Sequence, residues 1–77
     1  MKETEENNGE YYFEIGYAGN RVLATIRRTI GNSHVWGDFV KNKTFGKWWR
    51  EAKEEDYKEA REWAKKYIKI IIDANKQ

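Results

Sequence analysis

The feature that most constrains this chain is a run of strand-forming residues, Val22–Ile30, that has a Gly-Asn pair on each side. Gly19-Asn20 precedes the run and Gly31-Asn32 follows it. Such a pair between two strand-like segments is typical of a two-residue hairpin turn, because glycine readily adopts the positive φ that the first turn position requires. The pattern therefore predicts three antiparallel strands connected as a meander, with this run in the centre.

The two turns also predict how the strands pair. In the first hairpin Ala18 should face Arg21, and in the second Ile30 should face Ser33. Because alternate residues of a strand share a face, these registers separate an almost wholly apolar face from a mostly polar one. The apolar face would hold Phe13, Ile15, Tyr17, Val22, Ala24, Ile26, Val35, Gly37 and Phe39. The other face would hold Tyr12, Glu14, Leu23, Thr25, Arg27, Thr29, His34, Trp36 and Asp38.

The carboxy-terminal part of the chain has apolar residues at helical spacing and contains no proline. Two polar residues, Lys53 and Asp56, interrupt the apolar stripe of a single continuous helix. Asp56 and Glu59 also have the spacing of a capping box. We therefore expect a short helix over residues 44–54 and a long one over residues 56–75, with one bent helix as the alternative.

The expected fold is α+β: a three-stranded antiparallel meander with one face packed by a long carboxy-terminal helix, preceded by the short helix. The outer strands should cover residues 10–17 and 34–40. Trp63 belongs to the apolar stripe of the long helix and should lie in the core. Residues 1–9 carry no apolar side chain after the first methionine, so we expect a disordered acidic tail before a single domain over residues 10–77.

Composition excludes several kinds of site. The 77 residues include no cysteine, which removes disulfides, thiol catalysis and cysteine-based zinc sites. They include one histidine, which removes a histidine-rich metal site. No apolar run is long enough to cross a membrane, and the amino terminus lacks the pattern of a signal peptide, so we expect a cytoplasmic, intracellular chain. Gly16 and Gly19 flank a hairpin and open no helix, so there is no phosphate loop, and we expect no cofactor.

Charge is segregated along the chain, although the net charge is only +2. Residues 1–14 carry five acidic residues and one lysine, whereas residues 15–50 carry seven basic residues and one aspartate. Such an asymmetry indicates a polyanionic partner. The alternative is a solvated surface of mixed charge.

The polar sheet face carries the first candidate binding surface. With the expected registers, Tyr12, Arg27 and Trp36 form one row across the three strands, in which an arginine lies between two aromatic rings. On an open sheet such a row can stack on bases, or it can enter a major groove with the arginine reading guanine. Alternatively, Trp36 covers neighbouring apolar residues and the row stabilises the sheet by cross-strand pairing.

The second candidate is the segment 41–50, KNKTFGKWWR, in which basic and aromatic residues are interleaved. This composition is typical of phosphate and stacking contacts with nucleic acid. Its basic members are Lys41, Lys43, Lys47 and Arg50. Adjacent tryptophans on a helix point about 100° apart, so we assign Trp49 to the core and Trp48 to the surface. The alternative is that Trp48 closes one end of the core.

Catalysis has weaker support. Glu14 and Asp38 would flank Thr25 on the open face, with His34 nearby, and two carboxylates can carry out acid–base chemistry. An open sheet does not exclude water, however, and a fold of this size rarely provides a concave pocket. We therefore expect a protein that binds and is not an enzyme.

The predicted order of a three-stranded meander and a packed helix resembles the DNA-binding domains of the integrase amino-terminal and plant ethylene-response types. In those families the sheet enters the major groove with arginine and tryptophan on its outer face, and the resemblance implies this role for Arg27 and Trp36, and for Arg21 on the first hairpin. The chain's size and the amphipathic segment EAREWAKKYI also resemble small phage-encoded proteins. Some of these, including anti-CRISPR proteins, inhibit host nucleoprotein machines.

The leading hypothesis is a small non-enzymatic module that binds nucleic acid through the open sheet face and the segment 41–50. The alternative is an inhibitor of phage or mobile-element type, similar to anti-CRISPR proteins, that binds a host protein or nucleoprotein complex. A second alternative is a homodimer that closes sheet on sheet without a ligand.

Overall fold

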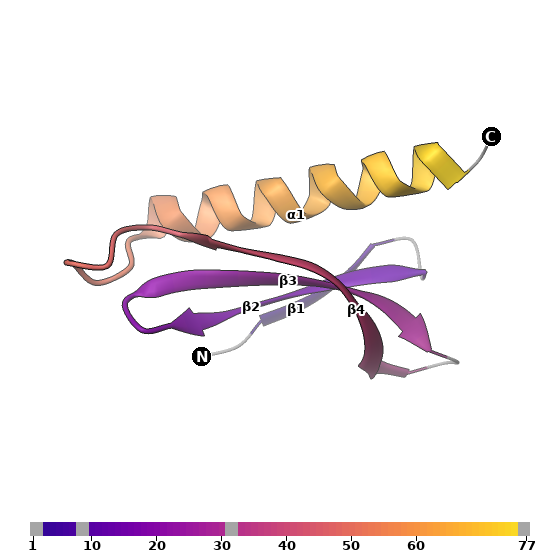
Figure 1. Cartoon of the computed structure of the whole chain (residues 1–77), viewed down its shortest axis with the longest axis horizontal. Coiled ribbons are helices and arrows are strands. Elements are labelled where there is room, and N and C mark those ends of the chain that lie inside the picture. Colours follow the sequence, from indigo (N-terminus) through magenta and orange to yellow (C-terminus); the bar gives the residue numbers. More distant parts are fainter. Residues whose placement is uncertain (1–2, 8–9, 31–32, 76–77) are drawn as a thin grey trace.

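The protein forms an antiparallel sheet with one helix lying along one face (Figure 1). The computed structural model describes residues 3–7, 10–30 and 33–75, and the side chains of 10–29 and 37–75. The strands are β1 (Glu3–Asn7), β2 (Tyr11–Ala18), β3 (Arg21–Ile30) and β4 (Ser33–Phe45), in that spatial order, and the helix α1 spans Glu54–Asn75. The predicted α+β class, a meander followed by a long carboxy-terminal helix, is confirmed.

The first hairpin forms as the Gly-Asn turn predicts. Strands β2 and β3 pair from Ala18 opposite Arg21 to Tyr11 opposite Arg28 without an irregularity. Gly19 has a φ of 65°, which lies in the left-handed region that glycine adopts without strain. The turn residue and the register therefore agree.

The core lies between this hairpin and α1. Its fully or nearly fully buried members are Tyr11, Phe13, Ile15, Val22, Ala24, Ile26, Ala60, Ala64 and Ile68. The alanines of α1 let the helix approach the sheet closely. Trp63 is half-buried at the edge of this core, where its ring centroid lies 5.8 Å from that of Phe45 and 5.5 Å from that of Tyr67.

Strand β4 pairs with β3 in a register that the second turn did not predict. Ile30 lies opposite Ser33 as expected, but two irregularities then shift the pairing along the strands. As a result Arg27 lies opposite Phe39 and not opposite Trp36. An extra residue in one strand changes which side chains share a face. The predicted second register is therefore wrong beyond the turn.

The shift exchanges the residues that β4 presents to the core. Phe39, which we expected under the helix, is 59% exposed. Lys41 and Lys43 instead lie opposite the core residues Ile26 and Ala24. Lysine can occupy such edge positions because its aliphatic stem covers apolar surface while its ammonium group reaches water.

The sheet face opposite α1 is not the open surface that the sequence predicted. Tyr12 on that face is 0% exposed, and Thr25 is 9% exposed. The amino-terminal half of β4 curves away from α1 and bends below the sheet (Figure 1). Gly37 there lies so close to Tyr12 that a Cβ on Gly37 would be 2.8 Å from the tyrosine Oη. The chain thus covers part of its own second face.

The amino-terminal segment adds a fourth strand at the edge of β2. Glu3–Asn7 form β1, with Glu3 opposite Ile15 and Asn7 opposite Tyr11. The prediction of a disordered tail is therefore wrong for these five residues. Pairing at a sheet edge uses backbone N–H and C=O groups, so it does not require apolar side chains. Residues 1–2 and 8–9 of the predicted tail lie outside the described residues.

The predicted short helix over residues 44–54 is absent from the structure, which describes all of these residues. Strand β4 continues to Phe45, and a loop over residues 46–53 leads into α1. Gly46 has a φ of 96°, a conformation that other residues rarely adopt, and it ends the strand with a sharp change of direction. The predicted interruption near residue 54 is real, but it separates loop from helix. The described part of the chain contains no helix with the length and apolarity needed to cross a membrane.

Candidate binding surface

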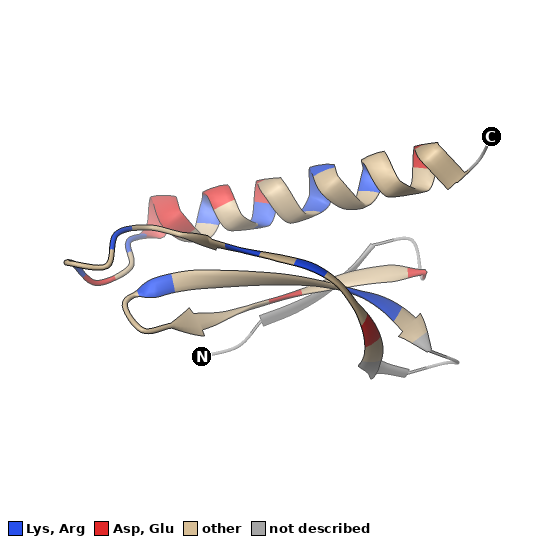
Figure 2. Cartoon of the chain, viewed as in Figure 1, with Lys and Arg blue, Asp and Glu red and all other residues tan. Residues whose placement is uncertain are grey.

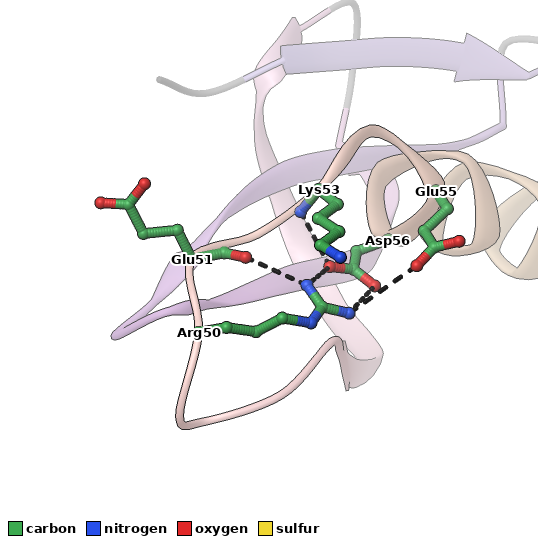
Figure 3. A network of polar contacts seen from close by, with 5 residues as sticks. All are labelled: Arg50, Glu51, Lys53, Glu55 and Asp56. Atoms are coloured by element: carbon green, nitrogen blue, oxygen red, sulfur yellow. Dashed lines mark hydrogen bonds and ion pairs between the residues drawn. The ribbon is translucent and has the colours of Figure 1, made fainter.

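The loop over residues 46–53 is fixed to the start of α1 through Asp56 (Figure 3). Arg50 Nη1 donates to Asp56 Oδ2 at 2.8 Å, and Nη2 donates to Oδ1 at 3.3 Å. The backbone N–H of Lys53 also donates to Asp56 Oδ2, at 2.9 Å. Asp56 is the third residue of the helix and reaches back to the residue before it, as the acidic partner of a capping box does. The predicted capping box, with Asp56 first and Glu59 as its partner, is wrong: Asp56 occupies the acidic position, and Lys53 in the first position has no side-chain acceptor.

We call the paired side chains of Arg50 and Asp56 the Arg50–Asp56 clamp. Their contacts favour the charged form of each side chain. Hydrogen bonding to Arg50, and then to the Lys53 amide, lowers the pKa of Asp56 below its usual range. The same hydrogen bond with Asp56 raises the pKa of Arg50. Arg50 also donates to the carbonyl oxygen of Glu51 at 3.0 Å and lies 3.8 Å from Glu55 Oε1. Its guanidinium is thus occupied by protein groups, and Arg50 holds the loop where we expected it to hold phosphate.

The clamped loop presents two tryptophans to solvent. Trp48 is 68% exposed and Trp49 is 63% exposed. Their ring centroids lie 5.5 Å apart with the planes at 90°, and Lys47 Nζ lies 5.7 Å from the centroid of Trp49. The exposure of Trp48 agrees with the prediction. The assignment of Trp49 to the core is wrong because the segment is a loop, in which helical spacing does not apply.

Three lysines precede the two tryptophans in the sequence, two on β4 and one in the loop. Lys41, Lys43 and Lys47 are all exposed, and none of their side chains has an ion pair or hydrogen bond with another described residue. Lys41 Nζ lies 5.9 Å from the ring centroid of Tyr67, and Lys43 Nζ lies 5.3 Å from that of Phe45. Figure 2 shows basic residues spaced along β4, whereas acidic residues gather at the start of α1. We call Lys41, Lys43, Lys47, Trp48 and Trp49 the tryptophan–lysine surface.

Two of the three arginines on β3, Arg27 and Arg28, are in contrast paired with acidic residues. Arg27 Nε lies 3.5 Å from Glu14 Oε2, and Arg27 Nη1 donates to the carbonyl oxygen of Gly37 at 3.2 Å. Arg28 Nη2 lies 3.6 Å from Glu10 Oε1. The charges of Arg27 and Arg28 are therefore balanced by acidic partners, whereas those of the three lysines of the tryptophan–lysine surface are not.

The structure assembles only half of the predicted row on the sheet face. Tyr12 lies opposite Arg27 as predicted, but Phe39 and not Trp36 lies opposite Arg27 on the other side. Tyr12 is buried, and Arg27 pairs with Glu14. The side chain of Trp36 lies outside the described residues. Arg21 of the first hairpin is half-buried, and its Nε is buried without a hydrogen-bond partner in the described part of the chain.

The carboxylates considered for catalysis are separated as well. Thr25 lies opposite Glu14 on one side and Asn42 on the other, so Asp38 is not its neighbour. Asp38 lies opposite Arg28. Arg28 is one position along β3 from Arg27, which shares a face with Thr25 and Glu14, so Asp38 lies on the opposite face of the sheet from Glu14. The side chain of His34 lies outside the described residues, within which no three potential metal ligands come together.

A hollow of about 310 Å³ lies beside the tryptophan–lysine surface. It is lined by Tyr17, Gly19, Asn20, Glu51, Ala52 and Tyr57. Asn20 Nδ2 donates to the carbonyl oxygen of Trp48 at 3.1 Å, which joins the β2–β3 turn to the loop. The Tyr57 hydroxyl donates to the Tyr17 hydroxyl, with the two rings edge to face at 6.0 Å. The sequence did not indicate this hollow, because its walls come from three segments that are distant along the chain.

Comparison with known proteins provides no further assignment. No protein-family model matches the chain, and no curated protein or solved structure matches it. The resemblances to three-stranded DNA-binding domains and to small phage-encoded proteins stay predictions. The geometry of the chain itself has to support any functional conclusion.

Proposed function

We propose that this protein is a small non-enzymatic module that binds single-stranded nucleic acid through the tryptophan–lysine surface. One observation carries the proposal: two tryptophans that are 68% and 63% exposed, with Lys47 beside Trp49, follow directly on a strand whose Lys41 and Lys43 have no acidic partner among the described residues. The sheet face, which we expected to contribute, is left out because Tyr12 is buried and Arg27 is paired.

Exposed tryptophans are costly in a chain of 77 residues, which has little apolar surface to form its core. Large exposed aromatic residues mark contact sites. Stacking of one base on an aromatic side chain contributes about 1–3 kcal/mol to binding, and it requires a base that is not already stacked in a duplex. The perpendicular rings of Trp48 and Trp49 can each accept a base where the strand turns.

The lysines add affinity that depends on salt. For a single strand, the logarithm of the binding constant falls with the logarithm of salt concentration by about 0.7 for each phosphate neutralised. Contacts from Lys41, Lys43 and Lys47 would therefore give a slope of roughly −2, and a loss of affinity of roughly 20-fold between about 50 and 200 mM salt.

A titration of tryptophan fluorescence with single-stranded DNA and RNA tests the proposal. Binding should quench the fluorescence, with the salt dependence given above, and Lys43→Ala should reduce the slope. Lys69→Ala on the exposed side of α1 removes the same charge and serves as the matched control, with an unchanged slope. Absence of binding at low salt would refute the proposal, since even non-specific electrostatic association should be detected there.

A second candidate is an inhibitor of phage or mobile-element type that binds a host protein or nucleoprotein complex. The same two tryptophans favour it, because tryptophan is enriched among the residues that dominate protein interfaces. Such an interface would be far less sensitive to salt than phosphate binding. A homodimer closing sheet on sheet has less support, because the large aromatic residue of that face, Tyr12, is already covered by its own chain.

A further inference from the structure

We infer that the hollow beside the tryptophan–lysine surface is a pocket for a single guanine base, an inference that rests on the proposed binding of nucleic acid. Its volume of about 310 Å³ is at the lower end of the range typical of small-molecule sites. It adjoins Trp48 through the hydrogen bond from Asn20 to the Trp48 carbonyl oxygen. The hollow thus lies next to the backbone of Trp48, and we place in it the base that follows the one stacked on Trp48.

Two tyrosines provide an aromatic wall for that base. Tyr17 and Tyr57 line the hollow, and the hydrogen bond between their hydroxyl groups holds both rings in place. Tyr17 is 50% exposed, so part of its ring is accessible to a stacked base. The guanidinium carbon of Arg61 lies 5.9 Å from the centroid of Tyr57 and supports that ring from the helix.

Glu51 provides the group that would select guanine. Its backbone carbonyl accepts a hydrogen bond from Arg50, while its carboxylate points away from the Arg50–Asp56 clamp (Figure 3). The Glu51 carboxylate has no ion pair or hydrogen bond within the described residues. Glu51 is one of the residues that line the hollow, and both oxygens of its carboxylate are available as acceptors.

A carboxylate with two available oxygens matches one base in particular. Guanine presents two adjacent donors, N1–H and the N2 amino group, on its Watson–Crick edge. Adenine and cytosine place a ring acceptor beside their amino group, and uracil has one donor between two carbonyl groups. A bidentate contact with a carboxylate is therefore open to guanine alone.

The hollow and the lysines of β4 differ in charge, so they would bind different parts of a nucleic-acid strand. Glu51 lies close to the first turn of α1, where Glu54 and Glu55 add negative charge beside the Arg50–Asp56 ion pair, so the hollow disfavours phosphate. A neutral base edge is not repelled in this way. Phosphates would bind at the lysines of β4, and one base would enter the hollow.

The inference is tested with short oligouridine strands that carry a central guanosine, adenosine, inosine or uridine, titrated against the full chain at low salt. The strand with guanosine should bind about 10-fold tighter than the all-uridine strand. Inosine lacks the 2-amino group and should lose most of this preference. Glu51→Gln should remove the preference and retain binding of the all-uridine strand.

Glu54→Gln is the matched control, because it removes one negative charge from the neighbouring helix start and leaves the hollow intact. It should keep the preference for guanosine. Equal affinity of the wild type for all four strands, or a preference that persists in Glu51→Gln, would overturn the guanine pocket while the proposed function stands. Absence of binding to every strand would overturn both.

Discussion

Replacing Gly37 with alanine tests the closure of the second sheet face. A Cβ at this position would lie 2.5 Å from the carbonyl oxygen of Arg28 and 2.9 Å from Cε1 of Tyr12. One of these contacts is with backbone, so a side-chain rotation cannot relieve it. The same substitution at Gly16 of β2 meets no atom within 4 Å and provides the matched control.

The magnitude follows from the two environments. Insertion of a methyl group into a closely packed site costs about 1–3 kcal/mol. Gly16→Ala should instead be neutral or stabilise by about 0.4–1 kcal/mol, because alanine reduces the entropy of the unfolded chain. A difference of about 2 kcal/mol between the variants corresponds to roughly 8–16 °C in the midpoint of thermal unfolding for a chain of this size.

Thermal and urea unfolding followed by circular dichroism measure this difference. In the register that the second turn predicted, Gly37 would lie opposite Ile26 under the helix, away from Tyr12. The observed register places it opposite Thr29. Equal unfolding midpoints for the two alanine variants would contradict the observed register and reopen the sheet face as a binding surface.

Three further outcomes are expected. Ile68→Ala removes a fully buried side chain of α1 and should cost about 2–5 kcal/mol in urea unfolding, enough to unfold much of the protein; a loss below about 1 kcal/mol would contradict the core packing. Trp49→Ala should leave the thermal midpoint nearly unchanged, since the ring is mostly exposed, and should weaken binding of single strands. Because the pKa of Asp56 is lowered, its contact with Arg50 stabilises the fold above the ordinary carboxyl pKa of 3.8, and this stabilisation is lost as the pH falls through the lowered value. Asp56→Asn should therefore reduce the dependence of the free energy of unfolding on pH in that range, and an unchanged dependence would count against the contact.

Local signals predicted the first hairpin and the helix well. Gly19-Asn20 specifies a turn, and the alternation on both sides agrees with only one register. The interruption of the apolar stripe by Lys53 and Asp56 marked the start of α1 to within two residues. In each case the determining interactions join residues that are close in sequence.

The second hairpin shows why the same reasoning failed elsewhere. The turn pairs Ile30 with Ser33 as predicted, but the irregularities that follow allow β4 to bend and let Gly37 cover Tyr12. That bend is stabilised by contacts across the sheet, which the pattern of one strand does not record. The absence of the short helix did have a local signal: Gly46 directly follows Phe45, and glycine favours a break in regular structure at that point.

Closure of the second face changes where a binding surface can form. Burial of Tyr12 leaves the loop after β4 as the place where the structure exposes a pair of large aromatic side chains, within the part of the chain it describes. A free loop would lose much of its binding energy in becoming ordered. The two-point ion pair of Arg50 with Asp56 holds the loop against the helix before any partner arrives. Arg50 thus supports the proposed site by positioning the tryptophans, a role that its basic character alone did not indicate.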